Sequence, residues 1–226
     1  MPEIKGKRYR KEVQQVSQTP LTVAEAVAKI KSFNSTKFDQ TVQCTFWLGI
    51  DPKQSDQIIR GAISLPHGIG KLKKVIAFCE EGDAEAAKKA GAIEAGCDEL
   101  IARVQGGWSD FDVAVASPKV MGKAGKLGRV LGPQGKMPSP KNGTVTADIV
   151  TAIKEFAAGK VEFKNDSGGN VHMVVGKQSF DSQKLIENID AVINHIKRIK
   201  PVSAKGTYIK KISLAAAMSP GVFIAV

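Results

Sequence analysis

Cysteine, histidine and aromatic residues are scarce in this chain of 226 residues, which has three cysteines, three histidines and aromatic side chains at 6% of positions. Cys44, Cys79 and Cys97 are odd in number and widely spaced, so we expect reduced thiols and not a disulfide framework. No two of these residues have the spacing of metal ligands, and no G-x-S-x-G motif supplies a serine nucleophile. We therefore expect no metal, no cofactor and no catalytic residues.

Long apolar runs are also missing. The longest runs, such as residues 214–218 and 222–226, are far too short to span a bilayer. The basic N-terminus, MPEIKGKRYRK, lacks the apolar stretch of a secretory signal. We expect a cytoplasmic protein that has no membrane partner.

Acidic residues are outnumbered, with 22 Asp and Glu against 33 Lys and Arg, which gives a net charge of +11. This excess favours a polyanionic partner such as nucleic acid. Most of it lies at the two ends of the chain: residues 1–67 and 159–226 together have 20 cations and 11 acidic residues, a net +9. Residues 68–158 have 13 and 11, a net +2.

Carboxylates are absent from residues 118–145, PKVMGKAGKLGRVLGPQGKMPSPKNGTV, which carry six cations. We call this the acid-free segment. Its glycine and proline content predicts that it packs no core and presents cations and backbone amides to an anion. Its glycines match neither the G-x-G-x-x-G motif nor a P-loop, which disfavours a nucleotide site. A solvated connecting loop remains the alternative.

The two ends of the chain have α+β character. Thr22 and Glu25 have the spacing of a capping box, which predicts a helix over residues 23–33, and a stripe of Leu, Ile and Val predicts another over residues 181–200. β-Branched and aromatic residues predict strands at 42–50, 161–164, 171–175, 209–214 and from 222 onward. Strands 161–164 and 171–175 are expected to pair as a hairpin.

The middle of the chain alternates apolar runs, at residues 75–79 and 113–116, with helical patterns at 83–90 and 146–158. This alternation predicts parallel βαβ units covered on both faces. The predicted fold class is α/β with two domains. A discontinuous α+β domain comes from residues 1–67 and 159–226, and residues 68–158 form an inserted α/β domain.

Candidate contacts to nucleic acid follow from the cations and aromatic side chains. Phe38 lies beside Lys37 in a polar connector, where an exposed ring could stack on an unpaired base; packing under a sheet edge is the alternative. Lys210 and Lys211 are adjacent on a predicted strand, so we expect them to face opposite sides. The cations at residues 197–200 either favour the helix dipole or contact RNA.

Five segments together resemble one known family. They are LGIDPKQSDQIIRGAISLPHGIGK (48–71), GWSDFDVAVASPKVM (107–121), GKLGRVLGPQGKMPSPKNGTV (125–145), VEFKND (161–166) and AKGTYIKK (204–211). Through them the chain is similar, over nearly its whole length, to the family of large-subunit ribosomal protein one, which forms the mobile stalk beside the tRNA exit site. The resemblance implies a split β-α-β domain, an inserted Rossmann-like domain and a hinge between them.

The resemblance also implies a non-enzymatic, cytoplasmic component of the ribosome that is a monomer there. It implies binding to large-subunit (23S-type) rRNA, help in releasing deacylated tRNA from the exit site, and repression of translation of its own operon mRNA. The competing interpretations are an enzyme that binds a nucleotide in the inserted domain and a general basic nucleic-acid chaperone.

The family's RNA contacts, carried over by position, predict a binding surface on the split domain. The implied RNA-binding residues are Glu25, Lys37, Phe38, Thr41, Lys164, Asn165, Asp166, His172, Lys205, Thr207, Lys211, Ala217, Met218 and Ser219. An auxiliary RNA contact is expected from cations of the acid-free segment: Lys123, Lys126, Arg129, Lys136 and Lys141.

One part of this surface departs from the family pattern. Similar sequences usually read Thr-Met-Gly where this chain has Ala217-Met218-Ser219. A lost hydroxyl removes one hydrogen bond, worth about 0.5–1.5 kcal/mol, so weaker RNA binding is expected. Ser219 also places a β-carbon where a glycine would allow close approach of the backbone.

Overall fold

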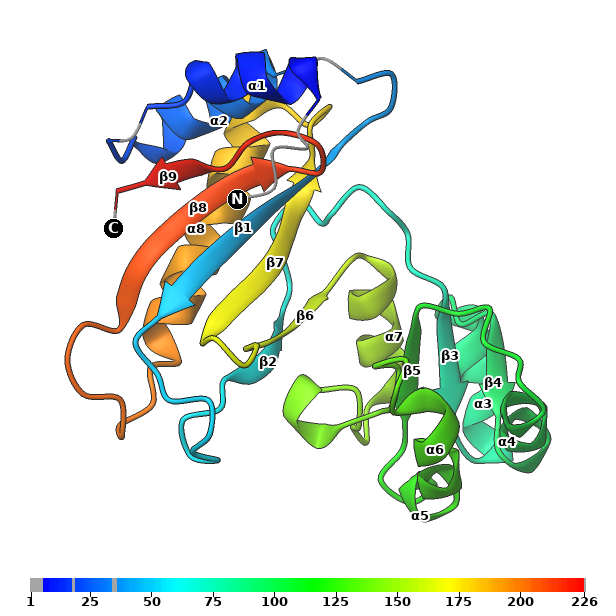
Figure 1. The fold of residues 1–226 in the computed structure, drawn as a ribbon. Coiled ribbons are helices and arrows are strands. Elements are labelled where there is room, and N and C mark those ends of the chain that lie inside the picture. The colour runs from blue at the N-terminus through cyan, green and yellow to red at the C-terminus, as the bar shows by residue number, and fades with distance from the viewer. Residues whose placement is uncertain (1–5, 18, 34–35, 226) are drawn as a thin grey trace. The chain divides into compact units, whose positions relative to one another are not determined.

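The computed structural model describes residues 6–17, 19–33 and 36–225, and Figure 1 shows its fold. Contacts within the chain divide it into two compact units. Unit 1 consists of Met1–Gly70 and Glu162–Val226, and unit 2 of Lys71–Val161. The divisions fall after residues 70 and 161, where the sequence predicted domain boundaries after residues 67 and 158.

Unit 1 is built on a four-stranded antiparallel sheet with the order β7-β1-β8-β9. Strand β1, from the N-terminal part of the chain, therefore lies between β7 and β8 from the C-terminal part, as Figure 1 shows. The strands are β1 (Thr41–Leu48), β7 (Asn170–Lys177), β8 (Ile209–Ala216) and β9 (Val222–Ile224). The predicted strands at 42–50 and 209–214 are confirmed as β1 and β8, with ends that differ by one or two residues.

One face of this sheet forms the core of unit 1. Along β1 every second side chain is buried, since successive side chains of a strand point to opposite faces. Helices α2 (Val23–Ser32) and α8 (Ser182–Arg198) contact strands of the sheet and each other, and their stripes of Val, Ile and Leu are buried. The opposite face, which carries Gln43, Thr45 and Trp47, is half-buried or exposed, and we call it the open face.

The predicted helices of unit 1 are confirmed. At the start of α2 the Glu25 N–H donates to Thr22 Oγ1 (3.4 Å) and the Thr22 N–H donates to Glu25 Oε2 (3.0 Å), which completes the capping box. Helix α8 begins after Asp181, whose carboxylate accepts from the Ser182 N–H. A short basic helix, α1 (Lys7–Gln14), precedes α2. No helix in the described part of the chain has the length and apolar character needed to cross a membrane.

The predicted hairpin between residues 161–164 and 171–175 is wrong. Strand β6 (Val161–Lys164) joins β2 (Arg60–Ile63) in a separate two-stranded sheet, while β7 joins β1. The reason lies in Asn165, whose N–H donates to the Ile59 carbonyl (2.9 Å) and whose Oδ1 accepts from the Ile59 N–H (2.9 Å). These bonds direct β6 toward β2, and only an isolated bridge spans the turn.

Unit 2 is a three-layer α/β structure. Its parallel sheet has the order β4-β3-β5, with β3 (Val75–Phe78), β4 (Glu94–Gly96) and β5 (Val113–Ala116). Parallel neighbours need a crossover connection, and α3 (Glu81–Lys89) and α4 (Asp98–Gln105) supply the two crossovers. The predicted parallel βαβ units are thereby confirmed.

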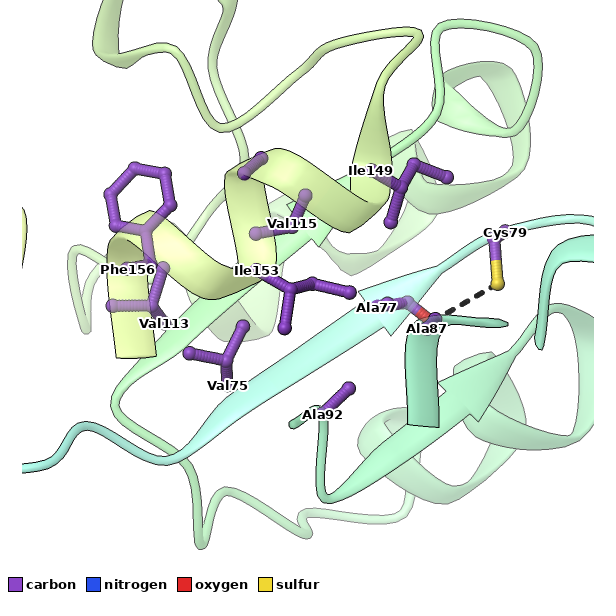
Figure 2. Packing of buried hydrophobic residues seen from close by; sticks show 11 residues of the cluster. Val75, Ala77, Cys79, Ala87, Ala92, Val113, Val115, Ile149, Ile153 and Phe156 are labelled. Atoms are coloured by element: carbon purple, nitrogen blue, oxygen red, sulfur yellow. Dashed lines mark hydrogen bonds between the residues drawn. The ribbon is translucent and has the colours of Figure 1, made fainter. Parts of the chain in front are cut away.

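Both faces of this sheet are buried. Figure 2 shows Ile149, Ile153 and Phe156 of α7 (Ile149–Ala157) packed on the face from which the side chains of Val75, Val113 and Val115 project. Helix α7 begins three residues later than predicted, because Asp148 caps it by accepting from the Thr151 N–H (3.1 Å). The other face is covered by α4 and by the acid-free segment.

The prediction that the acid-free segment packs no core is wrong. It folds into short helical pieces, among them α5 (Met121–Ala124), α6 (Gly128–Leu131) and a 3-10 turn between them. Leu127 and Leu131 are fully buried against the sheet. The apolar residues step by four, three and four positions, which places them on one helical face. They are Val120, Ala124, Leu127 and Leu131.

Candidate nucleic-acid interface

The residues that the sequence predicted to contact RNA lie mainly in unit 1, around the two ends of β1. At the first end the connector before β1 meets the turn after β8, since Val42 is the register partner of Ala216. At the second end, β1 and β8 pair through Trp47 and Lys211. The six residue steps from Thr41 to Trp47 separate the two ends by about 20 Å.

Gln40 joins the connector to the turn at the first end. Its side chain is buried, at 1% exposure. Its Oε1 accepts from the Met218 N–H (2.8 Å), and its Nε2 donates to Oε1 of Gln178 (3.1 Å). Gln40 could not be predicted from the sequence, because a polar residue before a strand gives no signal that it is buried.

Phe38 is 55% exposed, so the alternative that it packs under the sheet edge is wrong. Lys37 beside it is also exposed. The backbone around them is fixed: Oγ1 of Thr36 donates to the Phe38 carbonyl (3.1 Å), and the Asp39 carboxylate accepts from the N–H (3.0 Å) and hydroxyl (2.8 Å) of Ser179. Residues 36–39 therefore present an aromatic ring and a cation from a backbone held by hydrogen bonds.

Met218 lies in the turn after β8, and both its backbone N–H and its carbonyl are hydrogen-bonded to side chains outside the turn. Gln40 accepts from its N–H, and Nη2 of Arg8 in α1 donates to its carbonyl (3.1 Å). Ala217 and Met218 are exposed. The Ser219 hydroxyl accepts from the Ala216 N–H (2.9 Å) and donates to the Pro220 carbonyl (3.1 Å). Ser219 thus closes the turn by its own side chain.

Two further predicted residues near this end make contacts within the protein. Thr41 Oγ1 accepts from Lys177 Nζ (2.9 Å), which brings an additional cation to the start of β1. The Glu25 carboxylate is a helix cap, and the backbone N–H and hydroxyl of Thr22 that donate to it lower its pKa. Glu25 therefore has a structural role in α2.

The turn before β7 is organised by Asp166. Its carboxylate accepts from the side chain (3.0 Å) and the N–H (2.7 Å) of Asn170 and from the Gly168 N–H (2.8 Å), which lower its pKa to about 2. Asn165 is buried, and its amide is bonded to Ile59 and to the Asp166 carbonyl. These two side chains hold the turn together.

His172 and Lys164 flank this turn. His172 is exposed on β7 opposite Thr45, and its Nδ1 lies 3.2 Å from Thr45 Oγ1. Its Nε2 lies 3.6 Å from Oδ2 of Asp166. Lys164 is exposed at the end of β6. Lys164 and His172 are therefore the members of this predicted group whose side chains are exposed and basic, whereas Asn165 is buried.

The prediction that Lys210 and Lys211 face opposite sides is wrong. Lys211 pairs with Trp47, but Ile209 pairs with Leu48, so Lys210 is an extra residue and forms a β-bulge. A bulge sets two residues against one, and both lysines are exposed. Their Nζ atoms lie 4.9 Å (Lys210) and 5.9 Å (Lys211) from the centroid of the Trp47 ring.

Lys205 and Thr207 lie at the same end of the sheet. Both are exposed and, with Lys210, line a hollow in the surface of unit 1. The loop that carries Lys205 and Thr207 passes close to Gly49. A β-carbon on residue 49 would lie 2.3 Å from the Thr207 carbonyl oxygen. A glycine at position 49 is therefore what allows the loop to approach β1.

The cations of the acid-free segment fall into two sets. Lys119 pairs with Glu80 (3.2 Å), Lys123 pairs with Asp98 (2.8 Å), and Lys136 donates to the Ser109 carbonyl (2.9 Å). Lys126, Arg129 and Lys141 are exposed and form no ion pair with another described residue. Only these last three present an uncommitted charge to an outside anion.

The described residues contain no cluster of three or more His, Cys, Asp or Glu that could hold a metal. Burial raises the pKa of the thiols of Cys44 and Cys79, which keeps them protonated and unreactive. An ordered aromatic ring and thioether beside several lysines, on a strongly basic unit, are typical of a nucleic-acid-binding protein.

Comparison with known proteins gives the family. The chain belongs to the ribosomal protein L1p/L10e family, whose model matches residues 30–220. It is 49% identical to the large ribosomal subunit protein uL1 of Thermobifida fusca over 219 residues, which cover 96% of this chain and 93% of that protein. It is 49% identical to the uL1 protein of Cutibacterium acnes over 221 residues, which cover 97% of this chain and 95% of that protein. It is 48% identical to the uL1 protein of Bifidobacterium longum over 219 residues, which cover 96% of this chain and 95% of that protein. The family consists of ribosomal proteins and not of enzymes, so the nucleotide-dependent enzyme is set aside.

Proposed function

We propose that this protein is a structural component of the large ribosomal subunit in the cytoplasm and that unit 1 binds large-subunit (23S-type) rRNA at the mobile stalk. The observation that supports this most directly is the Gln40 link, which holds exposed Phe38 and exposed Met218 on one ordered edge. Lys37 and Lys177 add positive charge to that edge. Ordered cations and apolar side chains suit irregular RNA, whose unpaired bases can be stacked.

Unit 1 would act as a discontinuous RNA-binding domain of the split β-α-β type, with unit 2 as an inserted Rossmann-like domain. A hinge between the two domains would let the stalk move and assist release of deacylated tRNA from the exit site. Lys126, Arg129 and Lys141 would make the auxiliary RNA contact, because their charges are uncommitted. The same surface of unit 1 would bind the protein's own operon mRNA and repress its translation.

The test is competition between two RNAs at physiological salt: an RNA that contains the stalk region and an unrelated duplex of equal length. We expect the stalk RNA to bind at least 10³-fold more tightly, the lower limit typical of specific recognition. Equal affinities with a steep salt dependence would instead indicate a general basic chaperone.

Phe38→Ala supplies the residue-level test. We expect it to weaken stalk RNA binding by about 1–3 kcal/mol, the contribution of one base stacked on an aromatic ring, with little effect on the duplex. Val13→Ala, which truncates an exposed apolar residue of α1, is the matched control and should change neither affinity. A proportionate loss for both RNAs would leave Phe38 without a role in recognition.

A further inference from the structure

The open face of unit 1 carries two exposed aromatic rings: Trp47 lies toward the end far from Met218, and Phe223 pairs with Ser213 nearer the middle of the sheet. Trp47 is 41% exposed and Phe223 of β9 is 39% exposed. Lys211 lies between them, with its Nζ 5.9 Å from the centroid of Trp47 and 5.6 Å from that of Phe223. Lys210 Nζ lies 4.9 Å from the Trp47 centroid. We call these four residues the tryptophan platform.

The β-bulge at Lys210 is what builds the platform. In a regular strand Lys210 would point to the core face, where Ile209 and Ile212 are buried. The extra residue places both lysines on the open face opposite one tryptophan. The fold thus brings two ammonium groups to a single indole ring, although nothing in the core requires either lysine.

The surroundings of the platform favour a phosphate as well as a base. The hollow beside it is lined by Lys205, Thr207 and Lys210. Asp51 also lines the hollow, but its carboxylate accepts from the Lys53 N–H (3.0 Å) and from Nε2 of Gln54 (3.2 Å). Ser203, Gln54 and Gln57 also line the hollow, so cations, hydroxyls and amides surround one carboxylate, whose negative charge is outnumbered by Lys205 and Lys210.

We propose that the tryptophan platform binds one unpaired nucleobase of the RNA by stacking on Trp47, with the adjacent phosphate held by Lys210 and Lys211. The proposal rests on the proposed RNA-binding function and adds a second contact about 20 Å from the Met218 turn. Stacking of a base contributes more than an exposed cation–π contact does. The two ammonium groups would therefore leave the ring for the phosphate when the base binds.

Trp47 fluorescence reports this stacking directly. The chain has two tryptophans, so in full-length Trp108→Phe protein the emission comes from Trp47 alone. We expect quenching by stalk-region RNA and by single-stranded oligouridylate, and little quenching by an RNA duplex or by polyglutamate at equal charge. No quenching by the stalk RNA, or equal quenching by all four ligands, would overturn the proposal.

Affinity for the stalk RNA gives a second measure. Trp47→Leu keeps an apolar side chain but removes the aromatic face, and we expect Kd to rise about 5- to 30-fold, equivalent to about 1–2 kcal/mol. Trp47→Phe should retain most of the affinity, and Val13→Ala, at a residue of similar exposure (43%), should not change it. Thermal unfolding of each variant separates loss of fold from loss of contact.

Failure of this inference differs from failure of the proposed function. If the protein prefers stalk RNA and Phe38→Ala weakens binding while Trp47→Leu does not, the platform is not a base site and the proposed function stands. If the wild type does not prefer stalk RNA over the duplex, the proposed function itself fails. Because the two sites are distant, the fold-changes of Phe38→Ala and Trp47→Leu should multiply in the double variant, and strong coupling would contradict two separate contacts.

Discussion

Replacing Gln40 by Ala tests whether the Met218 turn must be held in place to bind RNA. The substitution removes the hydrogen bond that Oε1 accepts from the Met218 N–H and the one that Nε2 donates to Gln178. Each such bond contributes about 0.5–1.5 kcal/mol, so we expect the free energy of unfolding to fall by about 1–3 kcal/mol. For a protein of this size that corresponds to a decrease in Tm of roughly 2–12 °C.

Gln178→Ala is the matched control. It also removes two side-chain hydrogen bonds, one to Gln40 and one from Nε2 to the Ile30 carbonyl (3.1 Å), but it leaves the bond to Met218 in place. Both variants should therefore lose similar stability in thermal or urea unfolding. Only Gln40→Ala frees the turn that carries Met218.

The distinguishing measurement is affinity for stalk-region RNA at a temperature where both variants are folded. We expect Gln40→Ala to raise Kd about tenfold, because the loosened turn must be ordered again on binding, at a cost of about 1.4 kcal/mol. Gln178→Ala should leave Kd within about twofold of the wild type. Equal weakening by the two variants would show that general stability, and not the position of the turn, controls binding.

Three further predictions concern the fold. The pKa of Asp166 is lowered to about 2, so its carboxylate stabilises the folded state above pH 4, and that stabilisation is lost as the pH falls toward 2. The free energy of urea unfolding of Asp166→Ala should therefore lie below that of the wild type at pH 6 and converge with it near pH 2. A difference that stays constant with pH would refute this. Gly49→Ala should lower stability by about 1–3 kcal/mol because the β-carbon meets a backbone carbonyl at 2.3 Å, whereas Gly122→Ala, with no atom within 4 Å, should be neutral or stabilising in thermal unfolding. Leu127→Ala should cost about 2–5 kcal/mol, because Leu127 is fully buried; a surface loop would lose almost nothing.

The elements that the sequence predicted well are those whose signals are local. The capping box at Thr22 and Glu25 fixed the start of α2, and the apolar stripe fixed α8, because both depend on residues within a few positions of each other. The run at 113–116 was predicted to the residue, since a short parallel strand buried on both faces is apolar throughout.

The errors arose where distant parts of the chain decide the structure. Asn165 bonds to Ile59, more than a hundred residues away, and so diverts β6 from the predicted hairpin. The bulge at Lys210 depends on how β8 aligns with β1, which no local pattern reveals. In the acid-free segment the glycines and prolines concealed a four-residue apolar stripe that was present in the sequence and could have been found by its spacing.

In the candidate site, too, the residues with local signals could be predicted and those defined by distant contacts could not. Exposure of Phe38 could be anticipated from its polar neighbours, and Trp47 could have been placed on the open face from the strict alternation along β1. Gln40 could not, because its importance comes from a contact with Met218, 178 positions later.

The tryptophan platform also bears on Ala217, where the family resemblance predicts a threonine. Loss of a threonine hydroxyl there would remove a hydrogen bond worth about 0.5–1.5 kcal/mol, whereas one base stacked on an aromatic ring contributes about 1–3 kcal/mol. Ser219 keeps the turn closed through its own hydroxyl, so the change at Ala217 alters a contact and not the local fold. Stacking on Trp47 would then offset the lost hydroxyl, and both ends of β1 would contribute to binding. Ala217→Thr should accordingly strengthen stalk RNA binding by no more than about tenfold, and it should do so equally in the wild-type and Trp47→Leu backgrounds.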